Sequence, residues 1–277
     1  MRNSFCVVTP NYNMGDFLAD TIESVLANIH PGDSYFIIDG GSTDNSVEII
    51  RRYEDRLTGW VSEPDHGYAD ALAKGFERCE NDYQCWINSG DVLLKGALDI
   101  ARAELSNSGA DMIFGDDLYV DEAGNVIRAT NGHVSNLRNF MLYGGWTPLQ
   151  DACYWRSDLY LKAGGIDAGL RYAADYDFFL RVSLVGKCKY VPTTFSAFRQ
   201  HRGQTSIRGM NFYKLERERT RRNQLKTHGK SGLAGRLMAA YYWLVTRWRV
   251  RIQGAQRNAP AIKGLSAREI SSYSISK

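Results

Sequence analysis

The sequence has 277 residues, of which 44% are hydrophobic, 12% aromatic and 23% charged. This composition is that of a globular protein with a large core, so disorder over most of the chain is excluded. The formal net charge is only +3, but residues 201–277 hold 17 Lys and Arg against 3 Asp and Glu, while residues 1–200 hold 17 against 28. An acidic body is therefore followed by a basic tail.

The five cysteines are odd in number and form no Cys-x-x-Cys pair. They predict reduced, mostly buried thiols in a cytosol, with neither a disulfide framework nor a zinc site. The first ten residues hold an apolar run shorter than that of a signal peptide, and no stretch reaches the ~20 apolar residues of a membrane span. We therefore expect a cytoplasmic protein without a bilayer-spanning segment.

Short apolar runs alternate with segments of helical periodicity over the first 116 residues. Strands are predicted at residues 4–9, 34–39, 59–62, 83–88 and 111–116. Helices are predicted at residues 16–28, 46–57, 68–79 and 97–105. This alternation predicts a mostly parallel sheet with helices on both faces.

The regular alternation of strands and helices ends after residue 116. The segment "DLYVDEAGNVIRAT" predicts a hairpin around Gly124 and Asn125, and an irregular, aromatic-rich segment follows as far as Pro148. A helix is predicted for "ADYDFFLRVSLVG", and strands are predicted for "CKYVP" and "FSAFR". Beyond residue 200 the sequence is helical and basic.

Polar residues follow four of the predicted strands. They form the segments "TPNY" (9–12), "DGGSTD" (39–44), "SEPD" (62–65) and "NSGD" (88–91). Ligands of open α/β sheets bind beyond the carboxyl ends of the strands. Each segment alone is equally explained as a turn or a helix cap. Their convergence on one edge predicts a ligand site.

Two common nucleotide sites are excluded, since no G-x-G-x-x-G follows the first strand and no G-x-x-x-x-G-K-[ST] occurs anywhere. Carboxylates can instead accept hydrogen bonds from a base and a ribose hydroxyl. A divalent ion held by another carboxylate would neutralise a diphosphate.

Seven segments in this order carry a resemblance to a known family. They are "VVTPNYNMGDFLADTIESVLAN", "IIDGGSTDNSVEII", "SEPDHGYADALAKGF", "WINSGD", "GGWTPLQDACYWRSDLY", "AADYDFFLRV" and "FRQHRGQTS". Over about residues 4–206 the chain resembles the family 2 glycosyltransferases of the GT-A fold, an α/β fold with a Rossmann-like sheet. The resemblance implies an enzyme that transfers a sugar from a nucleotide-diphospho-sugar, of UDP or dTDP type, with inversion.

The resemblance also implies a domain organisation. Residues 1–206 would form the GT-A domain, in which residues 1–116 bind the nucleotide-sugar and residues 117–206 bind the acceptor. Residues 207–277 would form the basic helical tail.

The residues implied to bind the nucleotide-sugar lie at the strand ends or just beyond them. They are Thr9, Pro10, Asn11, Tyr12, Asp39, Asp65, Asp70, Asn88, Ser89, Gly90 and Asp91. Asp91 would also hold Mn²⁺ or Mg²⁺, with His201 as a second ligand. The segment "NSGD" has one carboxylate where the family often has adjacent aspartates, but Mg²⁺ takes only one or two protein carboxylates when phosphates and water complete its shell.

The resemblance assigns the general base to Asp175, with Arg181 as its supporting residue. Asp177 is the reserve candidate, although its i, i+4 spacing also predicts a surface pair with Arg181. Trp146, Gln150 and Tyr172 are expected to shape the acceptor pocket, because aromatic faces suit sugar rings. Ala174 and Ala73 stand where the family often carries Glu and Asn.

The tail segment 233–252 interleaves aromatic and aliphatic residues with Arg236, Arg247, Arg249 and Arg251. This pattern is typical of a helix lying in the headgroup region of an anionic membrane, so we expect a peripheral location on the inner face of the cytoplasmic membrane. The alternatives are a helix packed on the body or on a second copy in a homodimer. Nothing in the body resembles a nucleic-acid-binding module, so no nucleic acid is expected.

Such a transferase would act on a saccharide or lipid-linked acceptor in the biosynthesis of a cell-surface polysaccharide such as lipopolysaccharide O-antigen. Two other functions stay open at this point. One is a catalytically inactive sugar-nucleotide-binding or scaffold module. The other is a sugar nucleotidyltransferase, which needs a basic residue in the first loop, and "TPNYNMGD" offers none.

Overall fold

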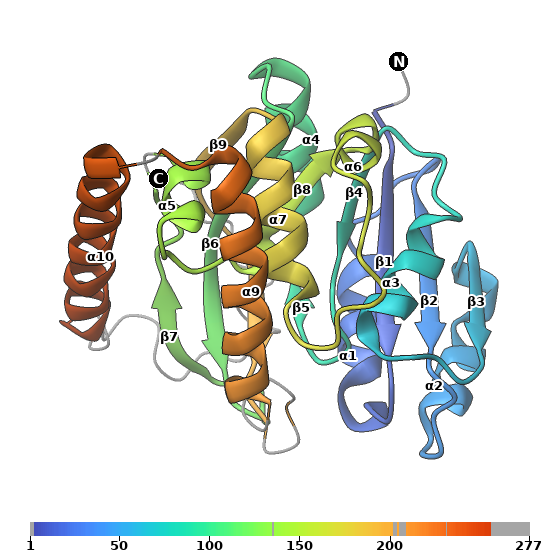
Figure 1. Ribbon diagram of the computed structural model, residues 1–277. Coiled ribbons are helices and arrows are strands. Elements are labelled where there is room, and N and C mark those ends of the chain that lie inside the picture. The colour runs from blue at the N-terminus through green and yellow to red at the C-terminus, as the bar shows by residue number, and fades with distance from the viewer. Residues whose placement is uncertain (1–2, 135, 202–203, 205–208, 231, 256–277) are drawn as a thin grey trace.

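A nine-stranded mixed sheet runs through the centre of the computed structural model, in the order β3-β2-β1-β4-β8-β6-β9-β5 with β7 paired to β6 (Figure 1). The structure describes residues 3–134, 136–201, 204, 209–230 and 232–255. The strands are β1 (Phe5–Asn11), β2 (Ser34–Asp39), β3 (Gly59–Ser62), β4 (Tyr83–Trp86), β5 (Val92–Leu93), β6 (Met112–Val120), β7 (Val126–Thr130), β8 (Cys153–Arg156) and β9 (Cys188–Arg199). The helices are α1 (Gly15–Leu26), α2 (Ser46–Arg52), η1 (Glu54–Arg56), α3 (Tyr68–Phe76), α4 (Ala97–Asn107), α5 (Leu137–Leu142), η2 (Gln150–Ala152), α6 (Ser157–Lys162), α7 (Ala174–Val185), α9 (Met210–His228) and α10 (Gly232–Ala255).

The first half of the sheet is parallel. β1 pairs with β2 and β4, and β2 pairs with β3, all in the parallel sense. Every residue of β1 is buried, which explains its unbroken apolar run, because helices cover both faces of the sheet. The predicted α/β class is confirmed. The helix predicted at 46–57 is shorter than expected and breaks after Arg52 into the single turn η1.

The second half contains elements that the sequence pattern did not predict, namely β5, β8, α5 and α6. β8 is antiparallel to both β4 and β6 and therefore joins the two halves of the sheet. The predicted hairpin is confirmed as β6 and β7. The two strands predicted at 188–192 and 195–199 are one strand, β9, which tolerates Pro192 because its pairing with β6 shifts register there.

Aromatic side chains fix α7 against the sheet where β4 meets β8. The rings of Trp86 and Phe179 stack with centroids 5.2 Å apart, and Trp155 lies 5.3 Å from Trp86. Pairs of this kind contribute about 0.5–1.5 kcal/mol beyond the burial of their area. Figure 1 shows α3, α7 and α9 in front of the sheet and α4 behind it. The packed core therefore sets the position of the first turn of α7.

The basic tail begins with α9, which lies along α7 (Figure 1). α10 packs one face on α5, where Tyr242 is buried and its ring stacks on Tyr143. The amide of Lys230 also donates to the Tyr143 hydroxyl at 2.7 Å. None of the helices in the described part of the chain combines the length and hydropathy needed to cross a membrane. Residues 256–277 of the tail lie outside the described residues.

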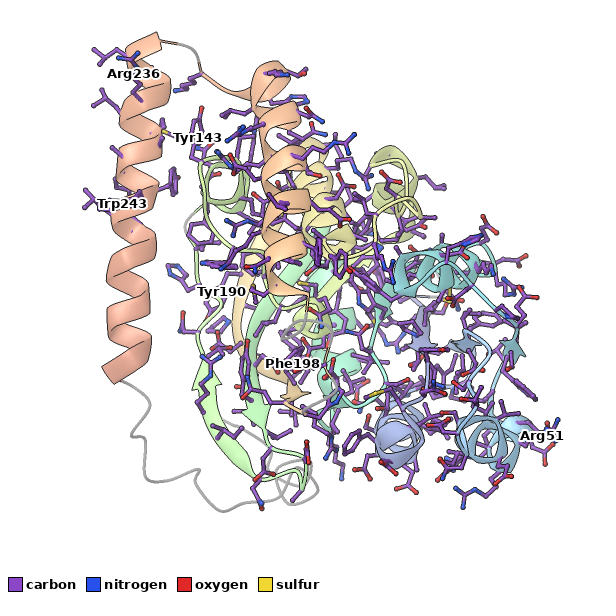
Figure 2. All side chains as sticks on the ribbon, turned by 60° about the horizontal axis from the view of Figure 1, so that its bottom comes forward. Arg51, Tyr143, Tyr190, Phe198, Arg236 and Trp243 are labelled. Carbon is purple, nitrogen blue, oxygen red and sulfur yellow. A yellow bond between two sulfur atoms is a disulfide. The ribbon has the colours of Figure 1, made fainter. Side chains whose placement is uncertain are left out.

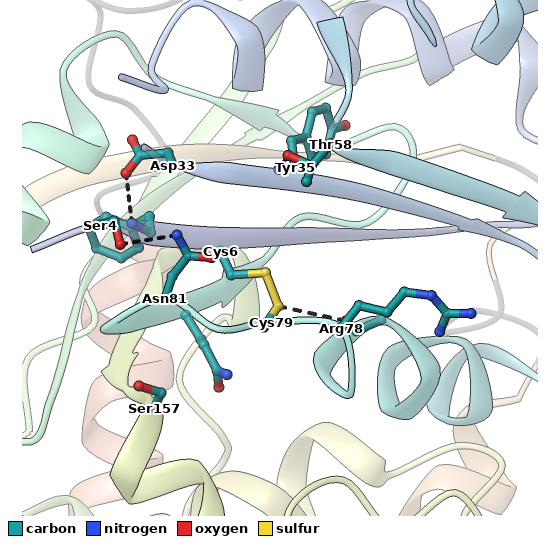
Figure 3. Close-up of a disulfide and its surroundings, with 12 residues drawn as sticks. Ser4, Cys6, Asp33, Tyr35, Thr58, Arg78, Cys79, Asn81 and Ser157 are labelled. Atoms are coloured by element: carbon teal, nitrogen blue, oxygen red, sulfur yellow. Dashed lines mark hydrogen bonds between the residues drawn. A yellow bond between two sulfur atoms is a disulfide. The ribbon is translucent and has the colours of Figure 1, made fainter. Parts of the chain in front are cut away.

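Cys6 and Cys79 form a disulfide, so the expectation of five reduced thiols is wrong for this pair (Figure 3). Cys6 lies in β1, and Cys79 follows α3, which packs on β1 and brings the two Cα atoms to 5.7 Å. Seventy-three positions separate the two cysteines, and no spacing rule finds a pair created by tertiary packing. The other three cysteines are free.

We expect non-reducing peptide mapping to recover Cys6 and Cys79 in one linked fragment. Cys79→Ser should lower the free energy of unfolding by about 2–4 kcal/mol, because the crosslink closes a long loop in the unfolded chain. Denaturant unfolding of wild type and variant, with and without reductant, measures this. A wild type whose midpoint is indifferent to reductant would contradict the assignment.

Candidate active site

The loops that follow β1 and β2 are locked together around Asp39. This buried carboxylate accepts hydrogen bonds from Asn11 Nδ2 at 2.6 Å, from the Ser62 hydroxyl at 2.6 Å, and from both the amide and the hydroxyl of Ser42. Asp44 accepts from the Gly15 amide in the same way and ties the start of α1 to the second loop. Asp39 therefore positions three strand ends.

The nucleotide residues predicted in the first strand end lie at different depths. Tyr12 is 61% exposed at the rim. Asn11 is buried, and its Oδ1 atom has no partner among the described residues. Thr9 is fully buried and its hydroxyl lies 3.0 Å from that of Tyr35, while Pro10 is also buried within β1. The roles of Thr9 and Pro10 in binding stay predictions, and neither side chain reaches the surface.

Asp65 and Asp70 lie at the entrance to α3. Asp65 accepts from the Gly67 amide, and burial raises its pKa. A Cβ on Gly40 would come within 2.7 Å of Asp65, so only glycine allows this approach. Asp70 accepts from the His66 amide at 3.1 Å and lies 3.4 Å from Lys74 Nζ. Both predicted carboxylates therefore lie beside the loop held by Asp39.

The turn at residues 88–91 is held by α1. The Gly90 amide donates to the Thr21 hydroxyl, which donates in turn to the Asp91 carbonyl. The Ser89 hydroxyl donates to the Pro10 carbonyl. Gly90 has φ +106°, a conformation that side chains rarely adopt. Thr21 is a residue that sequence reasoning missed, because its position on α1 suggests only core packing.

Arg199, at the end of β9, fixes the same turn from the other side. Its amide donates to Asp91 Oδ1 at 3.0 Å and its Nε donates to the Gly90 carbonyl at 2.8 Å. The remaining guanidinium donors bind the Glu122 carbonyl and Asp20. Arg199 is only 3% exposed and was missed, although it lies within the quoted motif "FRQHRGQTS".

Three buried carboxylates influence one another here: Asp91, Asp117 and Asp151. Burial raises the pKa of each, to about 7 for Asp151, and the charge of Asp151 raises the pKa values of the other two further. Asp117 accepts from the Ser196 hydroxyl at 3.0 Å. Asp91 Oδ2, Asp117 Oδ2 and both oxygens of Asp151 have no partner among the described residues. Neither Asp117 nor Asp151 was predicted, since each reads as an ordinary polar residue in the sequence.

The predicted metal ligands fit a divalent ion only in part. Among the residues that the structure describes, no group of three or more His, Cys, Asp or Glu side chains could hold a metal. The free Oδ2 atom of Asp91 is one suitable oxygen ligand. Burial lowers the pKa of His201, which favours the neutral imidazole that binds metals. A carboxylate oxygen and a neutral imidazole are donor types that can hold an ion whose other ligands are diphosphate and water. Residues 202–203 and 205–206 of the same motif lie outside the described residues.

Asp175 lies in the first turn of α7, between residues from two distant helices. Its amide donates to the Tyr68 hydroxyl at 3.0 Å, and the Tyr213 hydroxyl lies 3.5 Å from its Oδ2. Its Oδ1 is screened from solvent and accepts no hydrogen bond from any described residue. Burial raises the pKa of Asp175 to about 6. Tyr68 stands three residues after Asp65, so this contact joins the start of α3 to the start of α7.

The expected support of Asp175 by Arg181 is wrong. Arg181 Nη2 lies 2.5 Å from Asp177 Oδ2, and the same guanidinium donates to the carbonyl of Gly165. The predicted i, i+4 pair is therefore confirmed, but it is largely buried and not on the surface, and it occupies Asp177, the reserve base. Asp175 is the acid of this helix with an unengaged oxygen.

Two of the three expected acceptor residues, Tyr172 and Trp146, contact α9. The Tyr172 ring stacks on Phe212 at 5.3 Å, and Trp146, 42% exposed, lies against Arg217. Gln150 is buried in η2. Glu216 accepts hydrogen bonds from three successive backbone amides, at Arg171, Tyr172 and Ala173, at the start of α7. A carboxylate is favourable at a helix N-terminus, so α9 helps to hold Asp175 in place.

The mixed sheet, with carboxylates at its parallel strand ends and the half-buried Asp175 beyond them, is of the GT-A type found in sugar-transferring enzymes. The chain belongs to glycosyl transferase family 2, whose family model matches residues 6–175, and it is a glycosyltransferase. It is 32% identical over 185 residues to the uncharacterized glycosyltransferase Rv1514c of Mycobacterium tuberculosis, covering 65% of this chain and 68% of that protein. Family membership favours sugar transfer over the nucleotidyltransferase and scaffold alternatives.

Solved structures share the fold at low sequence identity. TarS 1–349 of S. aureus in complex with UDP-GlcNAc gives a TM-score of 0.66 at 15% identity, covering 87% of this chain and 71% of that chain. This chain spans only 43% of the longer TarS chain. The mannosyltransferase PcManGT of Pyrobaculum calidifontis, in complex with GDP-Man and Mn²⁺, gives 0.61 at 14% identity, covering 97% and 78%.

Asp151→Asn is expected to stabilise the protein at neutral and alkaline pH. The pKa of Asp151 is about 7 in the fold and about 4 in an unfolded chain. The unfolded state therefore loses its proton first, and stability falls as pH rises from about 4 to about 7. The variant has no carboxyl group at this position, so its free energy of unfolding does not fall in this way. Its Tm near pH 8 should therefore exceed that of the wild type by about 2–4 °C for each kcal/mol of difference in that free energy.

Scanning calorimetry at pH 4, 6 and 8 measures this, with the exposed Asp55→Asn as the control. A Tm shift in Asp151→Asn that is the same at all three pH values would refute the explanation.

Proposed function

We propose that this chain is an inverting glycosyltransferase that moves a sugar from a nucleotide-diphospho-sugar, of UDP or dTDP type, to a hydroxyl of a saccharide or lipid-linked acceptor. The pathway we propose is the biosynthesis of a cell-surface polysaccharide such as lipopolysaccharide O-antigen. The observation that carries the proposal is Asp175, a half-buried carboxylate whose Oδ1 has no hydrogen-bond partner among the described residues and whose pKa is raised to about 6.

Asp175 suits the role of general base. A base with a pKa near 6 is ionised at neutral pH and yet takes a proton more readily than an ordinary aspartate. The acceptor hydroxyl would give its proton to Oδ1 as its oxygen attacks the anomeric carbon and the bond to the diphosphate breaks on the opposite face. Attack opposite the leaving group inverts the anomeric centre.

The strand-end loops suit the donor. We propose that Asn11, Tyr12, Asp39 and Asp65 hold the base and ribose, with Thr9 and Pro10 beneath them and Asp70 near the ribose or the donor sugar. Asn88, Ser89 and Gly90 would face the diphosphate. Asp91 and His201 would hold Mn²⁺ or Mg²⁺, which stabilises the charge of the departing diphosphate. Arg199 keeps the Asp91 turn in shape.

Asp175→Asn should lower kcat by about 10²–10⁴-fold, the usual contribution of a general base. Release of nucleoside diphosphate, followed across a panel of nucleotide-sugars, is the measurement. The wild-type kcat/KM should fall as pH drops below about 6, where Asp175 becomes protonated.

Asp177→Asn is the matched control, because it removes an acid of the same helix that already pairs with Arg181. Its pH profile should keep the wild-type acidic limb, whatever its stability. Asp91→Asn and a chelator test the metal separately. Equal turnover by the wild type and Asp175→Asn would overturn the assignment of the base.

We also propose that α10 rests on the cytoplasmic membrane surface, with the tail near lipid-linked acceptors. Opposite the buried Tyr242, four exposed apolar residues share one stripe of the helix: Leu233, Leu237, Tyr241 and Leu244. Figure 2 shows Arg236 and Trp243 directed away from the body. Apolar and aromatic side chains flanked by arginine suit an anionic interface.

Leu237→Glu combined with Leu244→Glu should weaken binding to anionic vesicles at least about tenfold, because burying one leucine contributes about 1.5–3 kcal/mol. Co-sedimentation with vesicles, with and without anionic lipid and at rising salt, measures this. Leu215→Glu, an exposed leucine of α9, is the control. Sedimentation of the double variant equal to that of the wild type would refute membrane docking through this stripe.

A further inference from the structure

Arg217 of α9 has two guanidinium nitrogens with no hydrogen-bond partner among the described residues. Its Nε and Nη1 atoms are screened from solvent and make no hydrogen bond to any described residue. Among the described residues it also forms no ion pair, whereas Arg221, one turn further along the same helix, binds Glu218 through two nitrogens at 2.8 Å.

An unpaired guanidinium of this kind is costly. Arginine carries five N–H donors and a permanent charge, and removing such donors from water without replacement acceptors is unfavourable. The guanidinium lies 4.5 Å from the Trp146 ring centre and 5.8 Å from that of Tyr176. These ring faces attract the charge but accept none of the in-plane hydrogen bonds. The arrangement therefore lacks an anionic acceptor.

The position of Arg217 relates it to the proposed reaction centre. Tyr213, one helical turn earlier on the same face of α9, reaches Asp175. The turn separates the two side chains by about 5.4 Å along the helix. Tyr176, which Arg217 also contacts, follows Asp175 in sequence. Arg217 thus lies against Trp146, one turn along α9 from the Tyr213 side chain that reaches the proposed base.

The loop that carries Trp146 contains another polar atom without a partner among the described residues. The Thr147 hydroxyl oxygen is buried and makes no hydrogen bond to the described residues. It follows directly after Trp146, whose ring lies against the guanidinium, so the same loop also carries a neutral donor. A cationic fork, a neutral donor and an exposed indole together suit a sugar that carries an anion.

We propose that Arg217 and Trp146 form an acceptor subsite for a saccharide bearing an anionic group, either a phosphate ester or a carboxylate. The guanidinium binds the anion through its in-plane donors and the indole packs against the sugar ring. This inference rests on the proposed function, because it names the acceptor class of that same site. Its binding test, however, does not need turnover.

Titration calorimetry of the full chain with glucose, glucose 6-phosphate and glucuronate tests the subsite. Saturating UDP is included in one series, so that sugar phosphates are kept from the diphosphate position. The wild type should bind at least one anionic sugar about tenfold or more tightly than glucose, as expected for charge-assisted hydrogen bonds. The preference should shrink as salt rises. Tighter binding of the phosphate or of the uronate identifies the group.

Arg217→Gln should abolish the preference for the anionic sugar and leave UDP binding unchanged. Arg217→Lys should keep part of it, because the charge remains while the planar fork is lost. Arg219→Gln, an exposed arginine of the same helix, removes an equal charge and should behave as the wild type. Thermal unfolding of each variant checks that it is folded.

Equal binding of all three sugars by the wild type, or a preference that survives in folded Arg217→Gln, overturns the subsite. Failure of the proposed function looks different, since it would show as no diphosphate release from any nucleotide-sugar, whatever the sugar preference. The salt-dependent preference of the wild type keeps the proposal testable if Arg217→Gln does not fold.

Discussion

The structure depends on the burial of Arg199 at the point where its two halves meet. A buried guanidinium is tolerated only when its donors are satisfied, and this one binds the Gly90 carbonyl, the Glu122 carbonyl and Asp20. These partners belong to the turn after β4, the β6–β7 hairpin and α1. One side chain therefore fixes the relative positions of that turn, the hairpin and α1.

The position of Arg199 also affects the charge environment of Asp91. The Arg199 amide holds one oxygen of Asp91, while the other has no partner among the described residues. Burial and the charge of Asp151 raise the pKa values of both Asp91 and Asp117. The charge state of the single carboxylate in "NSGD" therefore depends on residues that are distant in sequence.

Much of the fold could be predicted from the sequence because its first half obeys simple periodicity. Strands 34–39 and 59–62 begin and end where the pattern placed them. The second half was harder, since β8 is only four residues long and its antiparallel pairing with β4 and β6 leaves no alternating signal. The disulfide between Cys6 and Cys79 was missed for a related reason: only tertiary packing makes them neighbours.

The residues of the candidate site form two groups, those that sequence motifs predict and those that only the structure reveals. Motif residues such as Asp39, Asp91 and Asp175 could be named from sequence, and Asp175 does lie with an unengaged oxygen in the first turn of α7. Residues that position others, such as Thr21 and Glu216, carry no motif. Their function exists only once α1 and α9 have packed against distant backbone amides and carbonyls.

The contribution of α9 comes from outside the family match. The family match ends at residue 175, yet Glu216 holds the loop before α7 and Tyr213 reaches Asp175 from beyond it. Under the proposed function, substitutions on one face of α9 would alter the choice of acceptor and leave the strand ends proposed for the donor as they are.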